Sequence, residues 1–177
     1  DAGEGDAMIS STPGVFLGVL TADCLPIICW ARTPRGYLAA VIHAGWRGTL
    51  KGVAIKTVQR IQSGHGTEAQ DLHCALGPVI GPCCYEIGTD VSDPLLQKWG
   101  EKAESSLKEK RGRTYLDLKR LNVALLAEAG VPVTQIASIG PCTACNPAEF
   151  FSYRRESQKG NRATGRQASF IGWTEIV

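Results

Sequence analysis

A cysteine and a histidine stand at the ends of two apolar segments. Cys24 ends GVLTADC, and His43 follows YLAAVI nineteen residues later. A thiolate and an imidazole that meet at neighbouring strand ends could bind a zinc-like metal, or act as nucleophile and base in a cysteine hydrolase. A small buried thiol and a core histidine are the alternative without chemistry. The context favours chemistry, because Asp23 precedes the cysteine and glycines and an arginine follow the histidine.

The segment HAGWRG comes just before a predicted helix. Free backbone N–H groups at a helix start, close approach at Gly45 and Gly48, and the guanidinium of Arg47 would suit a phosphate or a carboxylate. Alternatively, the glycines only shape the turn and Arg47 pairs with an acidic neighbour such as Asp23. The spacing leaves both interpretations open.

Aromatic and basic residues near the C-terminus form a second group of candidates. Tyr153 and Arg154 lie in FFSYRR, and Arg166 lies in GRQ. These side chains could stack on a ligand or donate hydrogen bonds to it, although such residues also pack on protein surfaces. We place them behind Cys24 and His43 as candidates for substrate binding.

Four other cysteines form two close pairs, Cys83 with Cys84 and Cys142 with Cys145. The Cys-x-x-Cys spacing of the second pair is that of zinc ligands. Adjacent cysteines, however, ligate one metal ion poorly, and loops rich in glycine and proline often bury cysteine as a small residue. We therefore interpret these four as small buried residues.

The elements that must position these candidates are short apolar strands and a few helices. Strands are predicted over residues 15–20, 26–30, 37–42, 72–76, 135–140 and 168–173. One helix is predicted over 49–61 with Thr49 as its N-cap, and another between Asp117 and Gly130. Residues 93–113 are polar and irregular, with a possible short helix over 95–99, and are expected to be a mobile surface excursion. The pattern predicts one α/β or α+β domain over residues 1–177, with mixed sheets.

Composition excludes several classes of protein. The chain has 177 residues, 44% of them hydrophobic, and a formal charge of +2 without a basic stripe, so no nucleic-acid partner is expected. No apolar run approaches the roughly 18 residues of a membrane span, and no signal sequence is visible. These features predict a cytoplasmic protein with reduced thiols. The opening stretch DAGEGDAMIS resembles the middle of a surface loop, so we expect an N-terminally incomplete domain.

Four segments together carry a family resemblance: GVLTADCLPI, HAGWRG, GPVIGPCCYEIG, and CTAC followed by FFSYRR. With GRQAS near the end, they resemble the laccase-domain family of zinc-containing purine nucleoside phosphorylases. The resemblance implies a four-layer α/β/β/α sandwich and a metal held by two histidines and a cysteine. Cys24 and His43 match the cysteine and the second histidine. In the family, the first histidine lies in a Gln-Val-His-Gly type segment. That segment is upstream of the loop that resembles DAGEGDAM of this chain.

The resemblance also implies an activity. Family members split adenosine, inosine, guanosine and methylthioadenosine with phosphate, and deaminate adenosine as well. Zinc is the implied cofactor, with copper as the alternative metal from older laccase or polyphenol oxidase descriptions. Three histidines cannot hold the several coppers of a multicopper oxidase. The catalytic candidates are Cys24, His43, Arg47 and Asp23, and the substrate-binding candidates are Gly45, Arg47, Tyr153, Arg154 and Arg166.

The sequence leaves two other functions open. A cysteine hydrolase would use Cys24 as nucleophile and His43 as base. This function is considered because the implied sandwich fold is shared with a bacterial toxin deamidase that has a cysteine and histidine pair. A non-catalytic protein that binds nucleoside or metal is the third interpretation. In each case the expected partners are small molecules, and we predict a monomer.

Overall fold

A five-stranded sheet forms the centre of the molecule, seen here in a computed structural model that describes residues 5–161 and 163–175. Its strand order is β1-β4-β3-β5-β9, with bounds β1 Ala7–Ser10, β3 Leu25–Thr33, β4 Gly36–Ala44, β5 His73–Leu76 and β9 Ile136–Ser138. All neighbours pair antiparallel except β5 and β9, which run parallel. The mixed sheet and the helices around it confirm the predicted α/β class.

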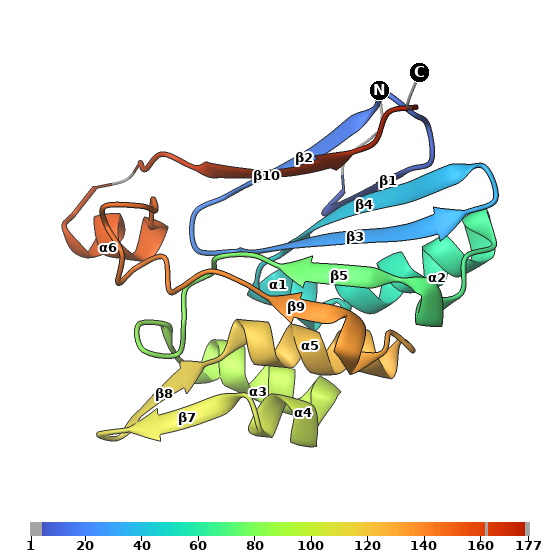
Figure 1. Cartoon of the computed structure of the whole chain (residues 1–177). Helices are drawn as coiled ribbons and strands as arrows, with labels where there is room; N and C mark the ends of the chain where they lie inside the picture. The colour runs from blue at the N-terminus through green and yellow to red at the C-terminus, as the bar shows by residue number, and fades with distance from the viewer. Residues whose placement is uncertain (1–4, 162, 176–177) are drawn as a thin grey trace.

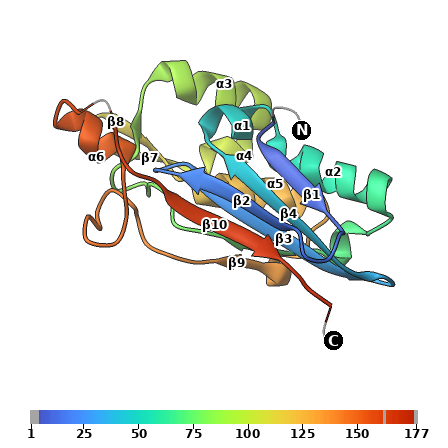
Figure 2. The same cartoon turned by 90° about the horizontal axis from the view of Figure 1, so that it is seen from above.

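A two-stranded ribbon covers one face of this sheet. It pairs β2 Phe16–Thr21 with β10 Gln167–Gly172, and Figure 2 shows the two strands lying over the sheet. Leu17 and Ile171 pack inward against Val41, whereas Phe16 and Phe170 point outward and are exposed. Alternate side chains of a strand point to opposite faces, so the ribbon has one buried and one open apolar face.

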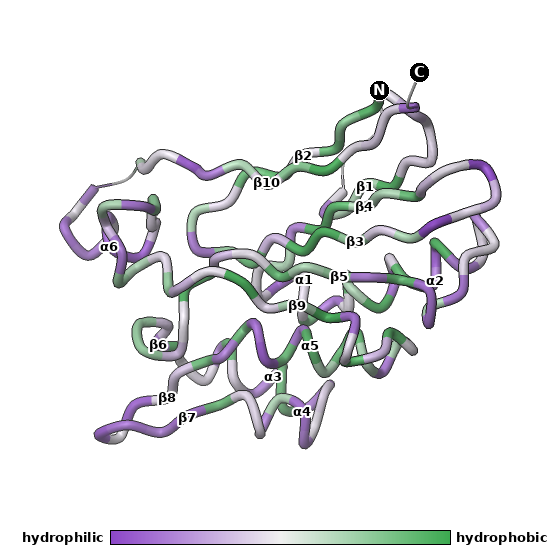
Figure 3. Tube along the Cα trace, in the orientation of Figure 1, coloured by the Kyte–Doolittle hydropathy of each residue, from purple (hydrophilic) through white to green (hydrophobic). Residues whose placement is uncertain are grey.

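Helices cover the other face of the sheet (Figure 1). The two longest packed against it are α2 Val53–His65 and α5 Leu118–Glu128. The core between helices and sheet is almost entirely aliphatic, and its fully buried side chains include Ile27, Leu38, Ile42, Ile61, Leu72, Leu76, Leu121 and Leu125. Figure 3 shows the contrast between the hydrophobic centre of β3 and β4 and the hydrophilic β7–β8 hairpin.

Three of the four implied layers are therefore visible: helices, sheet and ribbon. The described residues place no helix layer on the outer face of β2 and β10. None of the described helices has the length and hydropathy needed to cross a bilayer.

The prediction of a mobile excursion over residues 93–113 is wrong, although the short helix expected over 95–99 is confirmed. The segment contains most of α3 Thr89–Trp99, then α4 Glu101–Glu104 and β7 Leu107–Lys110, while β8 Arg113–Leu116 pairs with both β7 and β6 Glu86–Ile87. Leu95 and Ala103 are fully buried. A few well-spaced apolar residues anchor the segment to the core, although its composition is polar.

The remaining helices begin and end at special residues. The helix predicted over 49–61 is divided into α1 Trp46–Leu50 and α2 by Gly52, whose φ of 75° is left-handed. Thr49 therefore lies inside α1, and its assignment as N-cap is wrong. Asp117 does cap α5, accepting a hydrogen bond of 3.0 Å from the Arg120 N–H. Helix α6 Tyr153–Gln158 and the 3-10 turns Ala69–Asp71 and Val133–Gln135 complete the chain.

Candidate active site

The structure brings Cys24 and His43 together at one end of the central sheet. β3 and β4 pair antiparallel with Leu25 opposite Ala44, so the start of one strand meets the end of the other. A Cβ added at Gly45 would lie 3.0 Å from the Cys24 Sγ and 4.0 Å from the His43 Cε1. Glycine at this position therefore leaves room for both side chains, which is a packing role for Gly45.

Asp6 holds His43 in place. The imidazole Nδ1 donates to the Asp6 Oδ1 at 3.0 Å, and the backbone N–H of His43 donates to the Asp6 carbonyl at 2.7 Å. Hydrogen bonding to the Cys24 sulfur, with a further contribution from Asp6, raises the pKa of His43 to about 9 against the opposing effect of burial. Sequence reasoning missed Asp6, because the stretch around it looks like an ordinary acidic loop 37 residues away from the histidine.

Asp23 is a buried anchor beside Cys24. Its carboxylate accepts hydrogen bonds from the Thr143 hydroxyl at 2.6 Å, the Ser152 hydroxyl at 3.0 Å and the Arg154 N–H at 2.7 Å. Its φ of 86° lies in the left-handed region that non-glycine residues rarely occupy. Asp23 therefore ties the segments CTAC and FFSYRR to the loop that presents Cys24.

Among the described residues Arg47 does not pair with Asp23, the acidic neighbour named as its possible partner. The Asp23 oxygens are occupied by the three donors from the C-terminal segments, and the Arg47 guanidinium lies 4.5 Å from the centre of the Trp46 ring. Arg47 is exposed at the start of α1, where it is available to an incoming anion.

Arg154 acts mainly as a clamp. Its guanidinium donates to the carbonyl of Glu86 at 2.9 Å and lies over the Tyr85 ring, 5.4 Å from the centre. Tyr153, the first residue of α6, and Arg166, just before β10, are both exposed. Direct contact of Tyr153, Arg154 or Arg166 with substrate stays a prediction.

Tyr85 lies beside Arg154 near the candidate site, and sequence reasoning missed it. Burial is the main cause that raises its pKa to about 12, and the charges of Cys24, Arg154, Asp23 and Arg47 are near enough to act on it as well. The phenol is therefore neutral at physiological pH and presents an O–H group. Its place in GPVIGPCCYEIG, a loop with strong turn signals, was the available clue.

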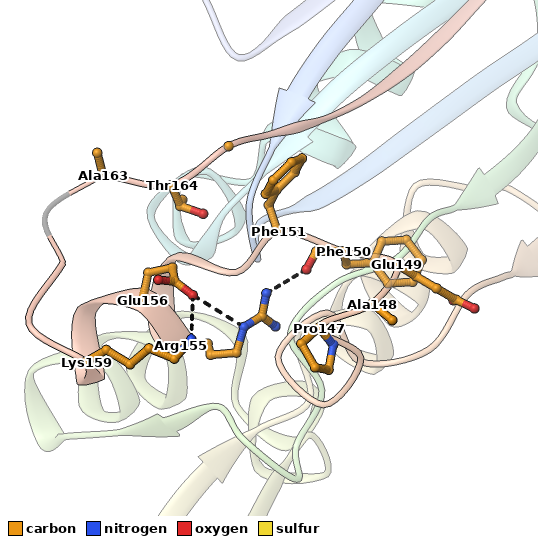
Figure 4. A pocket seen from close by; sticks show the side chains of 11 residues that line it. Pro147, Ala148, Glu149, Phe150, Phe151, Arg155, Glu156, Lys159, Ala163 and Thr164 are labelled. Carbon is orange, nitrogen blue, oxygen red and sulfur yellow. Dashed lines mark hydrogen bonds and ion pairs between the residues drawn. The ribbon is translucent and has the colours of Figure 1, made fainter.

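Two hollows lie near these residues. One of about 250 Å³ is lined by Asp6 and His43 together with apolar residues such as Met8 and Leu20. The other, of about 470 Å³, lies between α6 and the 147–151 segment and is shown in Figure 4. There Arg155 donates to the Phe150 carbonyl at 2.7 Å, so its charge is already engaged. The smaller hollow is the one that adjoins His43.

The donor atoms at this site suit zinc but do not complete its coordination. A thiolate and an imidazole are typical zinc ligands, and a catalytic zinc usually has three from the protein. Among the described residues, one group of three or more candidate metal ligands lies close together. It consists of Cys83, Cys84, Cys142 and Cys145. Cys83 and Cys145 are exposed and the other two are half-buried, so their interpretation as small buried residues is wrong.

Over residues 1–174 the sequence matches the family described as "Multi-copper polyphenol oxidoreductase laccase". The chain belongs to this family. It is 38% identical over 171 residues to "Purine nucleoside phosphorylase YlmD" of Geobacillus stearothermophilus, covering 96% of this chain and 60% of the relative. It is 34% identical over 156 residues to "Adenosine deaminase RL5" of an unknown prokaryotic organism, covering 85% of this chain and 56% of the relative.

The fold of this laccase-domain chain is also that of solved structures. The crystal structure of the Bacillus licheniformis hypothetical protein YfiH superposes with a TM-score of 0.86 at 34% identity, covering 96% of this chain and 61% of the other. The chain thus spans about 60% of the length of the curated YlmD relative.

Proposed function

We propose that this chain carries the active site of a purine nucleoside phosphorylase that uses adenosine, inosine, guanosine and methylthioadenosine, with adenosine deamination as a second activity. The observation that carries the proposal is the Cys24–His43 pair with Asp6 behind the imidazole. Relatives that bear the names phosphorylase and deaminase support it.

Cys24 and His43 would hold the metal, with zinc as the ion. The hydrogen bond from Nδ1 to Asp6 leaves Nε2 as the ligand atom, and a carboxylate behind a histidine is a common support for metal ligands. When bound, zinc would polarise an oxygen of the substrate or of phosphate. The third protein ligand would be the histidine of the upstream Gln-Val-His-Gly type segment. Zinc is favoured because a thiolate and an imidazole are typical zinc ligands.

The other residues would position the two substrates. Arg47, exposed at the start of α1, would pair with phosphate, and the hollow next to His43 would receive part of the nucleoside. Tyr85 would offer a neutral O–H group to the substrate, and Asp23 would hold the loop that presents Cys24. We further propose a monomeric, cytoplasmic protein.

Kinetics of Arg47→Ala test the phosphate assignment. The substitution should raise the KM for phosphate by about tenfold or more, the loss expected when a charge-assisted contact worth about 1.4 kcal/mol is removed. Arg32→Ala is the matched control, because Arg32 is also exposed but lies near the far end of β3. Unchanged phosphate dependence in Arg47→Ala would remove Arg47 from the site.

A cysteine hydrolase is the second candidate, and Asp6 favours it as well. Nucleophile, base and orienting carboxylate would be Cys24, His43 and Asp6. Alkylation with iodoacetamide separates the two functions. A zinc-bound Cys24 is protected until a chelator is added, whereas a hydrolase nucleophile reacts equally with and without chelator. A protein that binds nucleoside but shows neither phosphorolysis nor hydrolysis would be a non-catalytic binding protein.

A further inference from the structure

The four cysteines of the GPCC and CTAC segments form a compact group of sulfur atoms. Their ligand atoms all lie within 4.8 Å of one another. The Cys145 Sγ is 3.4 Å from the Cys83 Sγ and 3.2 Å from the Cys84 Sγ. Four sulfurs at about 2.3 Å from a tetrahedral zinc ion are separated from one another by about 3.8 Å. The observed spacing is close to that of a four-cysteine zinc site.

We propose that Cys83, Cys84, Cys142 and Cys145, here called the cysteine cluster, bind one structural zinc ion. This site is separate from the Cys24–His43 pair and independent of the proposed activity. All four ligands are thiols and all come from the protein, which is the pattern of a closed structural site and leaves no position open for a substrate.

The backbone answers the objection that adjacent cysteines cannot share a metal. The N–H groups of Cys84 and Tyr85 both donate to the Gly81 carbonyl, at 3.0 Å and 2.9 Å. This tight turn lets Cys83 and Cys84 both reach the Cys145 sulfur instead of pointing to opposite sides.

Gly81 also supports the cluster directly. Its N–H donates to the Cys142 Sγ at 3.2 Å, the kind of backbone donor that stabilises a metal-bound thiolate. A Cβ at Gly81 would lie 3.2 Å from the Cys142 Cβ and 3.4 Å from the Cys83 Sγ. A side chain at this position would therefore crowd the cluster, and glycine avoids that contact.

A buried pair elsewhere provides a useful contrast. The Cys29 and Cys74 sulfurs are 3.3 Å apart on neighbouring strands β3 and β5, inside the core. They are two thiols without further candidate ligands gathered around them among the described residues. Two close thiols alone are therefore not a sign of a metal site in this chain. Cys74 can serve as a control for the cysteine cluster.

The position of the cluster indicates what the ion would do. Thr143, between two of the cluster cysteines, donates to Asp23, and the Cys84 carbonyl accepts from Arg154 at 3.4 Å. Val79 and Cys142 form a parallel β-bridge between the two loops. An ion in the cluster would cross-link the loops that hold Asp23 and Tyr85 and so would fix the geometry beside Cys24.

Metal analysis in a Cys24→Ala/His43→Ala background tests the proposal, because that background lacks the proposed catalytic ligands. We expect about one zinc per chain, with X-ray absorption showing four sulfur ligands at about 2.3 Å. Cys145→Ser should lose that zinc, whereas Cys74→Ala should keep it.

Three results would overturn the proposal: a zinc-free background protein, zinc with nitrogen or oxygen ligands, or full retention of zinc in Cys145→Ser. Non-reducing mass spectrometry that finds the cluster as disulfides would also contradict it. The X-ray absorption measurement needs no cluster substitution, so it decides even if Cys145→Ser does not fold. Because the readout is metal content, failure here is distinguishable from failure of the proposed activity.

Discussion

At the scale of single residues, the site depends on contacts between segments far apart in the chain. Cys24 and His43 could be recognised from the sequence because each ends an apolar strand next to glycine or acidic residues. Asp6 could not, since nothing in its surroundings indicates that it meets His43 from 37 residues away. The same is true of Thr143 and Ser152, whose hydroxyl groups satisfy the buried carboxylate of Asp23.

The titration of His43 in the metal-free chain should report this arrangement. Its pKa is raised to about 9, first by the hydrogen bond to Cys24 and then by Asp6, so Cys24→Ser should lower the pKa more than Asp6→Asn does. A raised pKa stabilises the folded state below the usual histidine pKa of about 6.5, and that stabilisation is lost as pH rises through 9. NMR titration of the imidazole Cε1 proton measures it; a value near 6.5 in the parent protein would contradict the pairing.

Asp6→Asn should also weaken metal binding. Loss of a carboxylate that orients a metal-bound histidine typically costs about 10- to 100-fold in affinity. Competition with a zinc chelator measures the change. Glu68→Gln, which removes an acidic charge just before the 3-10 turn Ala69–Asp71, is the control and should leave the affinity unchanged. Equal affinities for the parent and Asp6→Asn would show that Asp6 does not support a metal ligand.

Removal of one donor to Asp23 should destabilise the fold. Thr143→Val deletes the 2.6 Å hydrogen bond to a buried carboxylate and should cost about 1.5–3 kcal/mol of unfolding free energy. Thr57→Val on α2 is the matched control, because the Thr57 hydroxyl donates to the neutral Val53 carbonyl and its loss should cost about 1 kcal/mol. Urea unfolding of both variants gives the comparison; equal losses would mean that Asp23 needs no such donor.

At the scale of elements, strands and the capped helix α5 could be predicted because their apolar periodicity and end signals agree. Residues 93–113 could not, because their few buried side chains are spread among charged ones and become visible only when the core is known. Helix α1 illustrates a different limit. Its start is set by Gly45 meeting Cys24 and His43, a tertiary requirement that local propensity does not contain.

Helix α5 gives the matching test at this scale. Leu121 is fully buried in the core, so Leu121→Ala should cost about 2–5 kcal/mol. Leu96 on α3 is 37% exposed, and Leu96→Ala should cost clearly less. Urea unfolding compares the two; a similar loss at both positions would contradict the assignment of α5 to the core layer.

At the scale of the whole molecule, the outer face of the β2–β10 ribbon is an open apolar surface. Phe16, Leu20 and Phe170 are 61%, 60% and 67% exposed on this face. Contiguous apolar patches of this kind are uncommon on free protein surfaces. The resemblance to a four-layer sandwich would explain why these side chains are exposed, since the fourth layer would lie on this face.

Dye binding tests this reading of the surface. The chain should enhance the fluorescence of an apolar dye, and Phe16→Ser/Phe170→Ser should reduce the enhancement severalfold. Val133→Ser is the control, because Val133 is 62% exposed but lies in the 3-10 turn before β9. Equal dye binding by all three proteins would show that the ribbon face is not an apolar patch in solution.

Cys24 and His43 are proposed to form a metal-dependent site for phosphorolysis. The most direct measurement is phosphate-dependent release of base from adenosine and inosine, by zinc-loaded protein that carries a Gln-Val-His-Gly type segment ahead of this chain. Release should require phosphate and should fall by about 100-fold or more in Cys24→Ser, as expected when a metal ligand is removed. Release that persists in Cys24→Ser, or that does not depend on phosphate, would contradict it.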